Sequence, residues 1–281
     1  MTDLFDFLIV GGDMRMKHLE KMLIEDGYKV KSIFTDNSSA DIAATVADNI
    51  ILPAPCSKAD GSLNAPFSDV KLSVVEIIEK FAKCKRVFGG MVAPVIKEKC
   101  QNMGVHCFDY MQCESLTIRN AQATAEGALK VAIENTDYTL CGSKVLVSGY
   151  GRIGKLLSRY LKALGADVTV EARKETDLAW IIANGYKALP LNQLRYNTGH
   201  FDIIFNTVPY EIFTEREIIN MNRNLVYIEL ASLPGGIDEI AAKRKKIKII
   251  KAASLPGKTA PQTSAEAIKY AILGMLKEAE V

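Results

Sequence analysis

Three glycines in the stretch SGYGRIG, residues 148–154, have the spacing G-x-G-x-x-G. The apolar run KVLV precedes them, and the helically periodic run KLLSRYLKALG follows. We therefore predict a strand over 144–148, a tight turn at Gly149 and a helix that begins near Arg152. In a strand–turn–helix unit of this kind, the loop amides and the helix N-terminus bind the pyrophosphate of a dinucleotide.

Each glycine of the motif has a separate task. Gly149 permits the tight turn, Gly151 lets a pyrophosphate approach the backbone, and Gly154 allows the helix to pack closely on the strand. Arg152 and Ile153 complete the loop and are predicted to bind the cofactor with the glycines. The alternative is that the glycines serve only the turn and the packing.

The next turn decides which dinucleotide fits. The helix is expected to end at Gly165, and another strand follows. In proteins that bind NAD, an acid at the end of this strand bonds the ribose 2′-hydroxyl, and Glu171 is at about that place. Ala172, Arg173 and Lys174 come next, and the planar fork of an arginine suits a 2′-phosphate. We expect these three residues to contact the cofactor and favour NADP, with NAD as the alternative.

Polar and glycine-rich loops follow other predicted strands, and ligands of open parallel sheets bind at the carboxyl ends of the strands. The loop NTVP is expected to border the nicotinamide ribose through Asn206, Thr207, Val208 and Pro209. Hydroxyls, open backbone amides and charged groups in the remaining loops suit a substrate carboxylate. The candidates are Asp13, Arg15, Ser232, Gly235, Gly236, Lys258 and Thr259. Ordinary turn chemistry is the alternative for each loop.

Two series of short strands alternate with helical segments, which predicts parallel sheets covered by helices on both faces. An alanine-rich helix over 115–137 separates the two series, and residues 53–68 form a long loop. The strands are expected at 4–10, 28–34, 49–52, 86–90 and 105–110, and then at 144–148, 167–171, 202–206, 225–229 and 247–251.

The predicted fold class is α/β, with two Rossmann-like or flavodoxin-like parallel-sheet domains joined by the long helix. We expect an N-terminal substrate-side domain over 1–118 and an NAD(P)-binding Rossmann domain over 119–259. The last helix, about 263–279, has no place in a completed second domain. Residues 260–281 are therefore expected to pack back on the first domain.

The composition is that of an ordinary globular protein. Of the 281 residues, 48% are hydrophobic and 24% are charged, and the formal net charge is +2. No general basic field therefore favours nucleic acid, and the basic run 243–246 is expected to be a solvated helix end. No apolar run approaches the roughly 20 residues that a membrane-spanning helix needs.

The N-terminus and the cysteines favour a cytoplasmic protein. Asp3 and Asp6 near the start are not typical of a signal peptide or a transit peptide. The six cysteines include no CxxC pair, and no His/Cys cluster has the spacing of zinc ligands. We expect reduced, mostly buried thiols and no metal.

The three histidines are His18, His106 and His200. None follows the last strands of the second domain, where D-2-hydroxyacid dehydrogenases carry their acid–base histidine. This placement argues against simple hydroxyacid oxidation. His18, in a helix, and His106, in a strand, are expected to be structural.

Several of these pieces, in this order and spacing, resemble the family of the dipicolinate synthase A subunit over nearly the whole chain. The matching segments are GGDMR (11–15), TAEGAL (124–129), TDYT (136–139), GSKVLVSGYGRIG (142–154), ALGADVTVEAR (163–173), NTVP (206–209), LASLPGGID (230–238) and LPGKTAP (255–261). The resemblance implies an NADP-dependent dehydrogenase of sporulating bacteria, in the mother-cell cytoplasm, that converts dihydrodipicolinate to dipicolinate. It also implies the flavoprotein-like B subunit of dipicolinate synthase as partner, and base rates suggest a homodimer.

Aromatising the substrate ring removes one hydride and one proton, and binding a dicarboxylate needs cationic or amide donors. Arg119 and Thr124 on the long helix are further candidates for this binding. Glu126 is the candidate proton acceptor, because a buried glutamate has a raised pKa. A structural hydrogen bond is the alternative for Glu126, and Lys258 is the second catalytic candidate.

The chain departs from the family pattern at two positions, where Leu233 and Gln262 stand in place of an arginine and a lysine. If those cations meet substrate carboxylates, this chain holds its substrate differently. Two other functions therefore stay open: another NAD(P)-dependent dehydrogenase of a small dicarboxylate, and a nucleotide-sensing assembly subunit.

Overall fold

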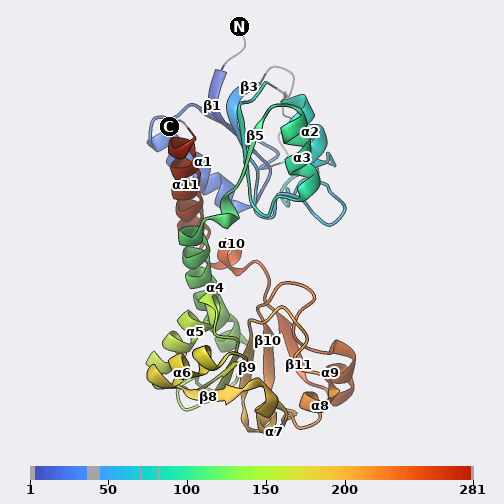
Figure 1. Ribbon diagram of the computed structural model, residues 1–281, viewed down its shortest axis with the longest axis vertical. Coiled ribbons are helices and arrows are strands. Elements are labelled where there is room, and N and C mark those ends of the chain that lie inside the picture. The colour runs from blue at the N-terminus through green and yellow to red at the C-terminus, as the bar shows by residue number, and fades with distance from the viewer. Residues whose placement is uncertain (1–3, 37–44, 70, 82, 280–281) are drawn as a thin grey trace. The chain divides into compact units, whose positions relative to one another are not determined.

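The computed structural model describes residues 4–36, 45–69, 71–81 and 83–279 (Figure 1). The chain forms two compact units, of which unit 1 comprises Met1–Asn120 with Ala260–Val281, and unit 2 comprises Ala121–Thr259. Asp3 and the last two residues of the chain lie outside the described residues, and Asp6 lies within the first strand. None of the helices in the described part combines the length and the apolar character that a bilayer crossing requires.

Unit 1 contains a five-stranded, entirely parallel sheet in the order β2-β1-β3-β4-β5. Its strands are β1 (Leu4–Val10), β2 (Val30–Ile33), β3 (Val46–Ile51), β4 (Arg86–Gly89) and β5 (His106–Asp109). All five strands predicted for this part of the chain are present. His106 lies exposed on β5, at the edge of the sheet.

Helices cover both faces of this sheet. They are α1 (Met14–Glu25), α2 (Val74–Lys80), α3 (Pro94–Asn102), the start of α4 (Glu114–Asn135) and α11 (Pro261–Glu278), with a 3-10 turn at Tyr110–Gln112. Alternate residues of β1 point to opposite faces: Phe7 packs on the α1 and α11 side, and Leu8 on the α2 and α3 side. This alternation explains why the buried end of β1, residues 7–10, is a continuous apolar run, since a strand segment buried on both faces needs apolar residues at every position,. Figure 1 shows α11 alongside α1.

Unit 2 contains a six-stranded parallel sheet in the order β11-β10-β9-β6-β7-β8. Its strands are β6 (Lys144–Ser148), β7 (Asp167–Ala172), β8 (Lys187–Pro190), β9 (Ile203–Asn206), β10 (Val226–Glu229) and β11 (Lys248–Lys251). The sequence did not predict β8. This strand lies at the edge of the sheet, has only four residues and ends in a proline, so its pattern is weak,.

The second half of α4 supplies buried alanines to the core of unit 2, where Ala125, Ala128 and Ala132 belong to the same cluster as the buried side of α5. The other helices are α5 (Arg152–Ala163), α6 (Glu175–Ala183), α7 (Leu194–Asn197), α8 (Glu215–Ile218), α9 (Glu239–Lys245) and α10 (Leu255–Thr259), with 3-10 turns at Leu191–Gln193 and Thr198–His200. The basic run ends α9, as predicted. The segment LPGKT was expected to be a loop and is the short helix α10, because Leu255 is anchored in this core.

Candidate functional site

The strand order of unit 2 reverses between β6 and β9, which places the loops after these two strands on either side of a crevice,. The loops are joined directly. The Thr207 amide and the Thr207 hydroxyl both donate to the Ser148 carbonyl, at 3.0 and 2.8 Å. The predicted glycine loop therefore lies where an open parallel sheet binds its ligand.

The three glycines of the loop differ in what surrounds them. Gly149 has a φ of +92°, a backbone conformation that residues with a side chain rarely adopt,. A Cβ at Gly154 would lie 2.0 Å from the Gly149 carbonyl oxygen, so the start of α5 packs against the turn. A Cβ at Gly151 would meet no described atom within 4 Å, and Gly151, the N-cap residue of α5, has no side chain with which to cap the helix. The structure thus leaves an open approach to backbone amides at Gly151.

Beside this loop lies a cavity of about 460 Å³. Of the predicted cofactor residues, Gly149, Ala172, Arg173, Lys174 and Val208 line it. The sequence missed Tyr150, Asp177, Leu191, Tyr210 and Ile212. Tyr150 was a variable position inside the motif, and Leu191 follows the strand that the sequence did not predict.

Glu171 borders this cavity but its carboxylate is held inside the sheet. The side chain is buried, and Ser148 Oγ donates to Glu171 Oε2 at 2.8 Å. Burial raises the pKa of Glu171, and the hydrogen bond from Ser148 opposes this. Arg173 and Lys174 are exposed at the end of β7. The residue at the strand end is Ala172, so the turn presents two cations and no acid.

The NTVP loop is held mainly by its own side chains. Asn206 is fully buried, and its Nδ2 donates to the Val208 carbonyl at 2.9 Å and to Glu229 Oε1 at 2.7 Å. The Thr207 hydroxyl is bonded to the backbone of β6. Of the four predicted residues, only Val208 lines the cavity. The Asn206 and Thr207 side chains therefore shape the loop, and its place beside the nicotinamide ribose stays a prediction.

The backbone amides of Gly235 and Gly236 are not open, contrary to the prediction. The Gly235 amide donates to the Ser232 carbonyl at 3.0 Å, and the Gly236 amide donates to Glu229 Oε2 at 2.8 Å. Glu229 also accepts from the Ala231 amide at 3.0 Å. A buried carboxylate at the end of β10 therefore organises the loop. An acid that ends an otherwise apolar strand was the sequence signal that could have found it.

Glu126 was predicted to be buried, and this prediction is wrong. It lies on the exposed side of α4, where Gln122 Nε2 donates to Glu126 Oε1 at 3.4 Å. Ala125 and Ala128, its neighbours along the helix, occupy the buried side. The burial on which the proton-acceptor role depended is therefore missing.

The other candidates are spread over both units. Lys258 is exposed on α10, and the Thr259 hydroxyl packs toward α4, where a Cβ at Gly127 would lie 2.8 Å from it. Thr124 is half-buried on α4. The remaining residues lie on the surface: Ser232 is exposed, Leu233 is 90% exposed, Gln262 is exposed on α11, and Arg119 lies 5.4 Å from the ring centroid of Tyr270.

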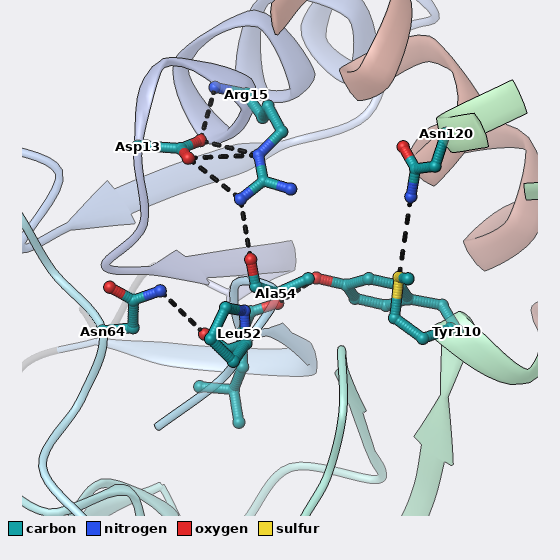
Figure 2. Close-up of polar contacts among 9 residues, drawn as sticks. Asp13, Arg15, Leu52, Ala54, Asn64, Tyr110 and Asn120 are labelled. Atoms are coloured by element: carbon teal, nitrogen blue, oxygen red, sulfur yellow. Dashed lines mark hydrogen bonds and ion pairs between the residues drawn. The ribbon is translucent and has the colours of Figure 1, made fainter. Parts of the chain in front are cut away.

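Unit 1 has its own reversal of strand order, between β1 and β3. Asp13 follows β1, caps α1 by accepting from the Arg15 amide at 3.0 Å, and binds the Arg15 side chain through Nε at 2.9 Å and Nη2 at 2.9 Å. Arg15 Nη2 also donates to the Ala54 carbonyl after β3 at 2.7 Å (Figure 2). One guanidinium thus ties together the two loops at this reversal.

The Arg15 side chain is only 9% exposed. Within the described residues, Nη1 makes no hydrogen bond or ion pair. Nearby, the buried Tyr110 hydroxyl donates to the Leu52 carbonyl at 2.9 Å, and burial raises the pKa of Tyr110. Asn64 Nδ2 donates to the Pro55 carbonyl at 3.0 Å. Asp13 therefore positions the Arg15 guanidinium, and the N–H groups of Arg15 Nη1 are available to donate hydrogen bonds to an anion.

The strand orders and the glycine-loop cavity define a Rossmann-type α/β protein of two parallel-sheet units, which confirms the predicted fold class,. Residues 6–111 match the family model for the N-terminal domain of the dipicolinate synthase A subunit. The A subunit of dipicolinate synthase from Bacillus subtilis (strain 168) is 29% identical over 283 residues, which cover 96% of this chain and 95% of that protein.

Solved structures agree with this relationship. The dipicolinate synthase A subunit from Bacillus halodurans has a TM-score of 0.84 at 27% identity, covering 96% of this chain and 97% of that one. These findings confirm that the chain resembles the A subunit of dipicolinate synthase over nearly its whole length. A transhydrogenase from Sinorhizobium meliloti shares the fold with a TM-score of 0.68 at 14% identity, covering 97% of this chain and 94% of that one.

Proposed function

We propose that this chain oxidises dihydrodipicolinate to dipicolinate with NADP, as the dehydrogenase component of a dipicolinate synthase. The proposal is supported chiefly by one observation: the glycine loop that begins α5 adjoins a cavity whose rim carries Arg173 and Lys174. The resemblance to the dipicolinate synthase A subunit supplies the reaction. The B subunit as partner, a homodimer and the cytoplasm of the sporulating mother cell belong to the same proposal.

The residues of unit 2 suit a dinucleotide with a 2′-phosphate. The N-cap residue of α5 is a glycine and brings no capping side chain to the helix, and Gly151 leaves room beside the first turn for a pyrophosphate,. Arg173 offers the bidentate fork that a 2′-phosphate needs, and Glu171 is turned away from it,. A nicotinamide cofactor supplies a hydride acceptor when bound.

We propose that Arg15 binds a carboxylate of the substrate. It lies at the strand-order reversal of unit 1, the place where open parallel sheets bind ligands,. Asp13 and the Ala54 carbonyl fix the guanidinium plane, so that Nη1 offers its N–H groups in a defined direction. A pre-oriented donor loses little side-chain entropy when the carboxylate binds.

The exposure of Glu126 does not support it as the acceptor of the ring proton. Lys258, also exposed, stays a proposed contact of the substrate: its ammonium can pair with a carboxylate. Aromatisation provides the driving force of the reaction. The protein therefore has mainly to position the ring and keep its carboxylates paired.

The reaction itself is the test. Dihydrodipicolinate is generated enzymatically and added to this chain with NADP, with and without the B subunit, and dipicolinate is followed by terbium luminescence. Formation of dipicolinate by the chain alone supports the proposal. Formation only when both proteins are present would show that the chain and the B subunit share the activity.

Two outcomes would replace the proposal. Absence of product with either mixture, together with tight NADPH binding and turnover of another dicarboxylate, would indicate a different dehydrogenase, and the uncharged Leu233 and Gln262 would be the first residues to exchange. Tight NADPH binding without turnover of any dicarboxylate would favour a nucleotide-sensing protein.

A further inference from the structure

A second cavity in unit 2, of about 390 Å³, is not used by the proposed reaction. It lies between α5 and the C-terminal end of α6, and Tyr150 lines both this cavity and the cofactor cavity. Its volume is that of a site for a small molecule. The residues that bear on its chemistry are Tyr150, Lys155, Arg159, Trp180, Asn184 and Tyr186.

Two cations of α5 line this cavity without an acidic partner. Lys155 and Arg159 are one helical turn apart, and both are exposed. Neither forms an ion pair within the described part of the chain. Like charges at this spacing destabilise a helix, and an anion bound between them would remove that repulsion.

The remaining lining of the cavity is largely aromatic. Trp180 is 63% exposed, which is unusual for a tryptophan without a ligand or partner,. Burial raises the pKa of Tyr150, and a hydrogen bond with Asn184 opposes this. Burial also raises the pKa of Tyr186, and the charge of Arg159, which lines the same cavity, opposes this.

We propose that this cavity binds a planar aromatic carboxylate. The ring would stack on the aromatic side chains Trp180 and Tyr186, which favour offset or edge contacts with another ring. The carboxylate would accept charge-assisted hydrogen bonds from Lys155 and Arg159. The inference goes beyond the proposed function and does not depend on it, since the cavity alone carries the argument.

Trp180 makes this proposal directly measurable, because it is the only tryptophan of the chain. The full chain, without cofactor, is titrated with pyridine-2,6-dicarboxylate and with benzoate at constant ionic strength, and tryptophan fluorescence is recorded. Glutarate serves as a dicarboxylate without a ring. A saturable change with both aromatic acids and none with glutarate is expected. No saturable change with the aromatic acids, or an equal response to glutarate, would overturn the proposal.

Substitutions locate the bound acid. Arg159→Gln should weaken the aromatic acids about tenfold, the usual effect of losing one charged hydrogen-bond donor. Arg195→Gln is the matched control, because Arg195 is also exposed and stacks on its neighbour Tyr196, with Cζ 4.5 Å from the ring centroid. It should leave the titration unchanged.

A third variant separates the two cavities of unit 2. If Arg173→Gln weakens the response and Arg159→Gln does not, the acid binds in the cofactor cavity and the proposal is overturned. The reverse pattern supports it. The titration involves neither cofactor nor turnover, so a chain without dehydrogenase activity would give the same answer.

Discussion

At the scale of single residues, the charge of the turn after β7 depends on where the Glu171 carboxylate points. The Ser148 hydroxyl holds this carboxylate within the sheet, so the charged groups of the turn are Arg173 and Lys174. A ribose 2′-hydroxyl gains little from such a turn, whereas a 2′-phosphate gains charge-assisted hydrogen bonds.

Arg173→Gln should therefore weaken NADPH about tenfold or more and change NADH affinity less than about twofold, because only NADPH carries the phosphate that the guanidinium would bind. Calorimetric titration of both cofactors measures this, with Arg195→Gln as the control. Equal weakening of the two cofactors would contradict the 2′-phosphate assignment.

The buried Glu171 should also make stability depend on pH. Burial raises the pKa of its carboxyl above the ordinary value of 4.5. The stability that the protonated group contributes is present below pH 4.5 and is lost as pH rises through the folded-state pKa,. Glu171→Gln should thus gain stability relative to the unsubstituted chain as pH rises from about 4 to 7. Urea unfolding across this range measures the difference, and a difference independent of pH would contradict it.

Arg15 is the third residue whose geometry makes a kinetic prediction. Arg15→Lys keeps a positive charge beside Asp13 but lacks the Nη1 donors, so we expect KM for dihydrodipicolinate to rise about tenfold. NADPH affinity should stay unchanged, because Arg15 lies in unit 1. Steady-state kinetics with a parallel NADPH titration measure both, and an unchanged KM would remove Arg15 from the substrate site.

At the scale of elements, α5 and its preceding turn combine two different demands on glycine. The Gly154 position is closed by the protein itself, since a Cβ there would lie 2.0 Å from the Gly149 oxygen. The Gly151 position has open space around it. Gly154 therefore serves the packing of the helix, and Gly151 is available to serve a ligand.

Alanine at Gly154 should mainly affect stability, and alanine at Gly151 should mainly affect NADPH binding. Gly154→Ala should lower the free energy of unfolding of unit 2 by about 3 kcal/mol or more, as overpacking against backbone does. Gly151→Ala should cost less than about 1 kcal/mol, the difference between two helix N-cap residues, and still abolish tight NADPH binding. Urea unfolding and NADPH titration of both variants test the pair. Unchanged NADPH affinity of Gly151→Ala would contradict a pyrophosphate at this loop.

At the scale of the whole molecule, unit 1 is completed by the end of the chain. Ile268 and Ile272 of α11 are buried in the same core as Leu19 and Leu23 of α1. A chain that ends at Thr259 loses these contacts, and the two isoleucines alone account for about 3–6 kcal/mol of burial free energy.

Truncation after Thr259 should therefore destabilise unit 1 and leave NADPH binding by unit 2 intact. Hydrogen exchange at the amides of β1 and α1 measures the first effect, and NADPH titration measures the second. A chain that ends at Glu278 retains α11 and is the control. Slow exchange at β1 in the shorter chain would show that α11 is dispensable.

The sequence by itself determined the features that depend on neighbouring residues. The predicted strands are all present, the glycine loop joins β6 to α5, and the long helix and the terminal helix lie close to their predicted limits. These features follow from apolar periodicity and from glycine placement, which are readable within a few positions. The short strand β8 was not predicted, because four residues at a sheet edge show little hydrophobic periodicity.

Only the tertiary structure decided what each polar group does. The Ser148–Glu171 and Asn206–Glu229 bonds each join residues 23 positions apart, and the Arg15–Ala54 bond spans 39. The first two bonds join the ends of neighbouring strands, and the third joins the start of α1 to the loop after β3. The crossover connections bring these distant segments to one edge of a sheet. The direction of Glu171, the engaged Gly236 amide and the exposure of Glu126 all follow from such packing, because burial and hydrogen-bond partners depend on residues distant in the chain.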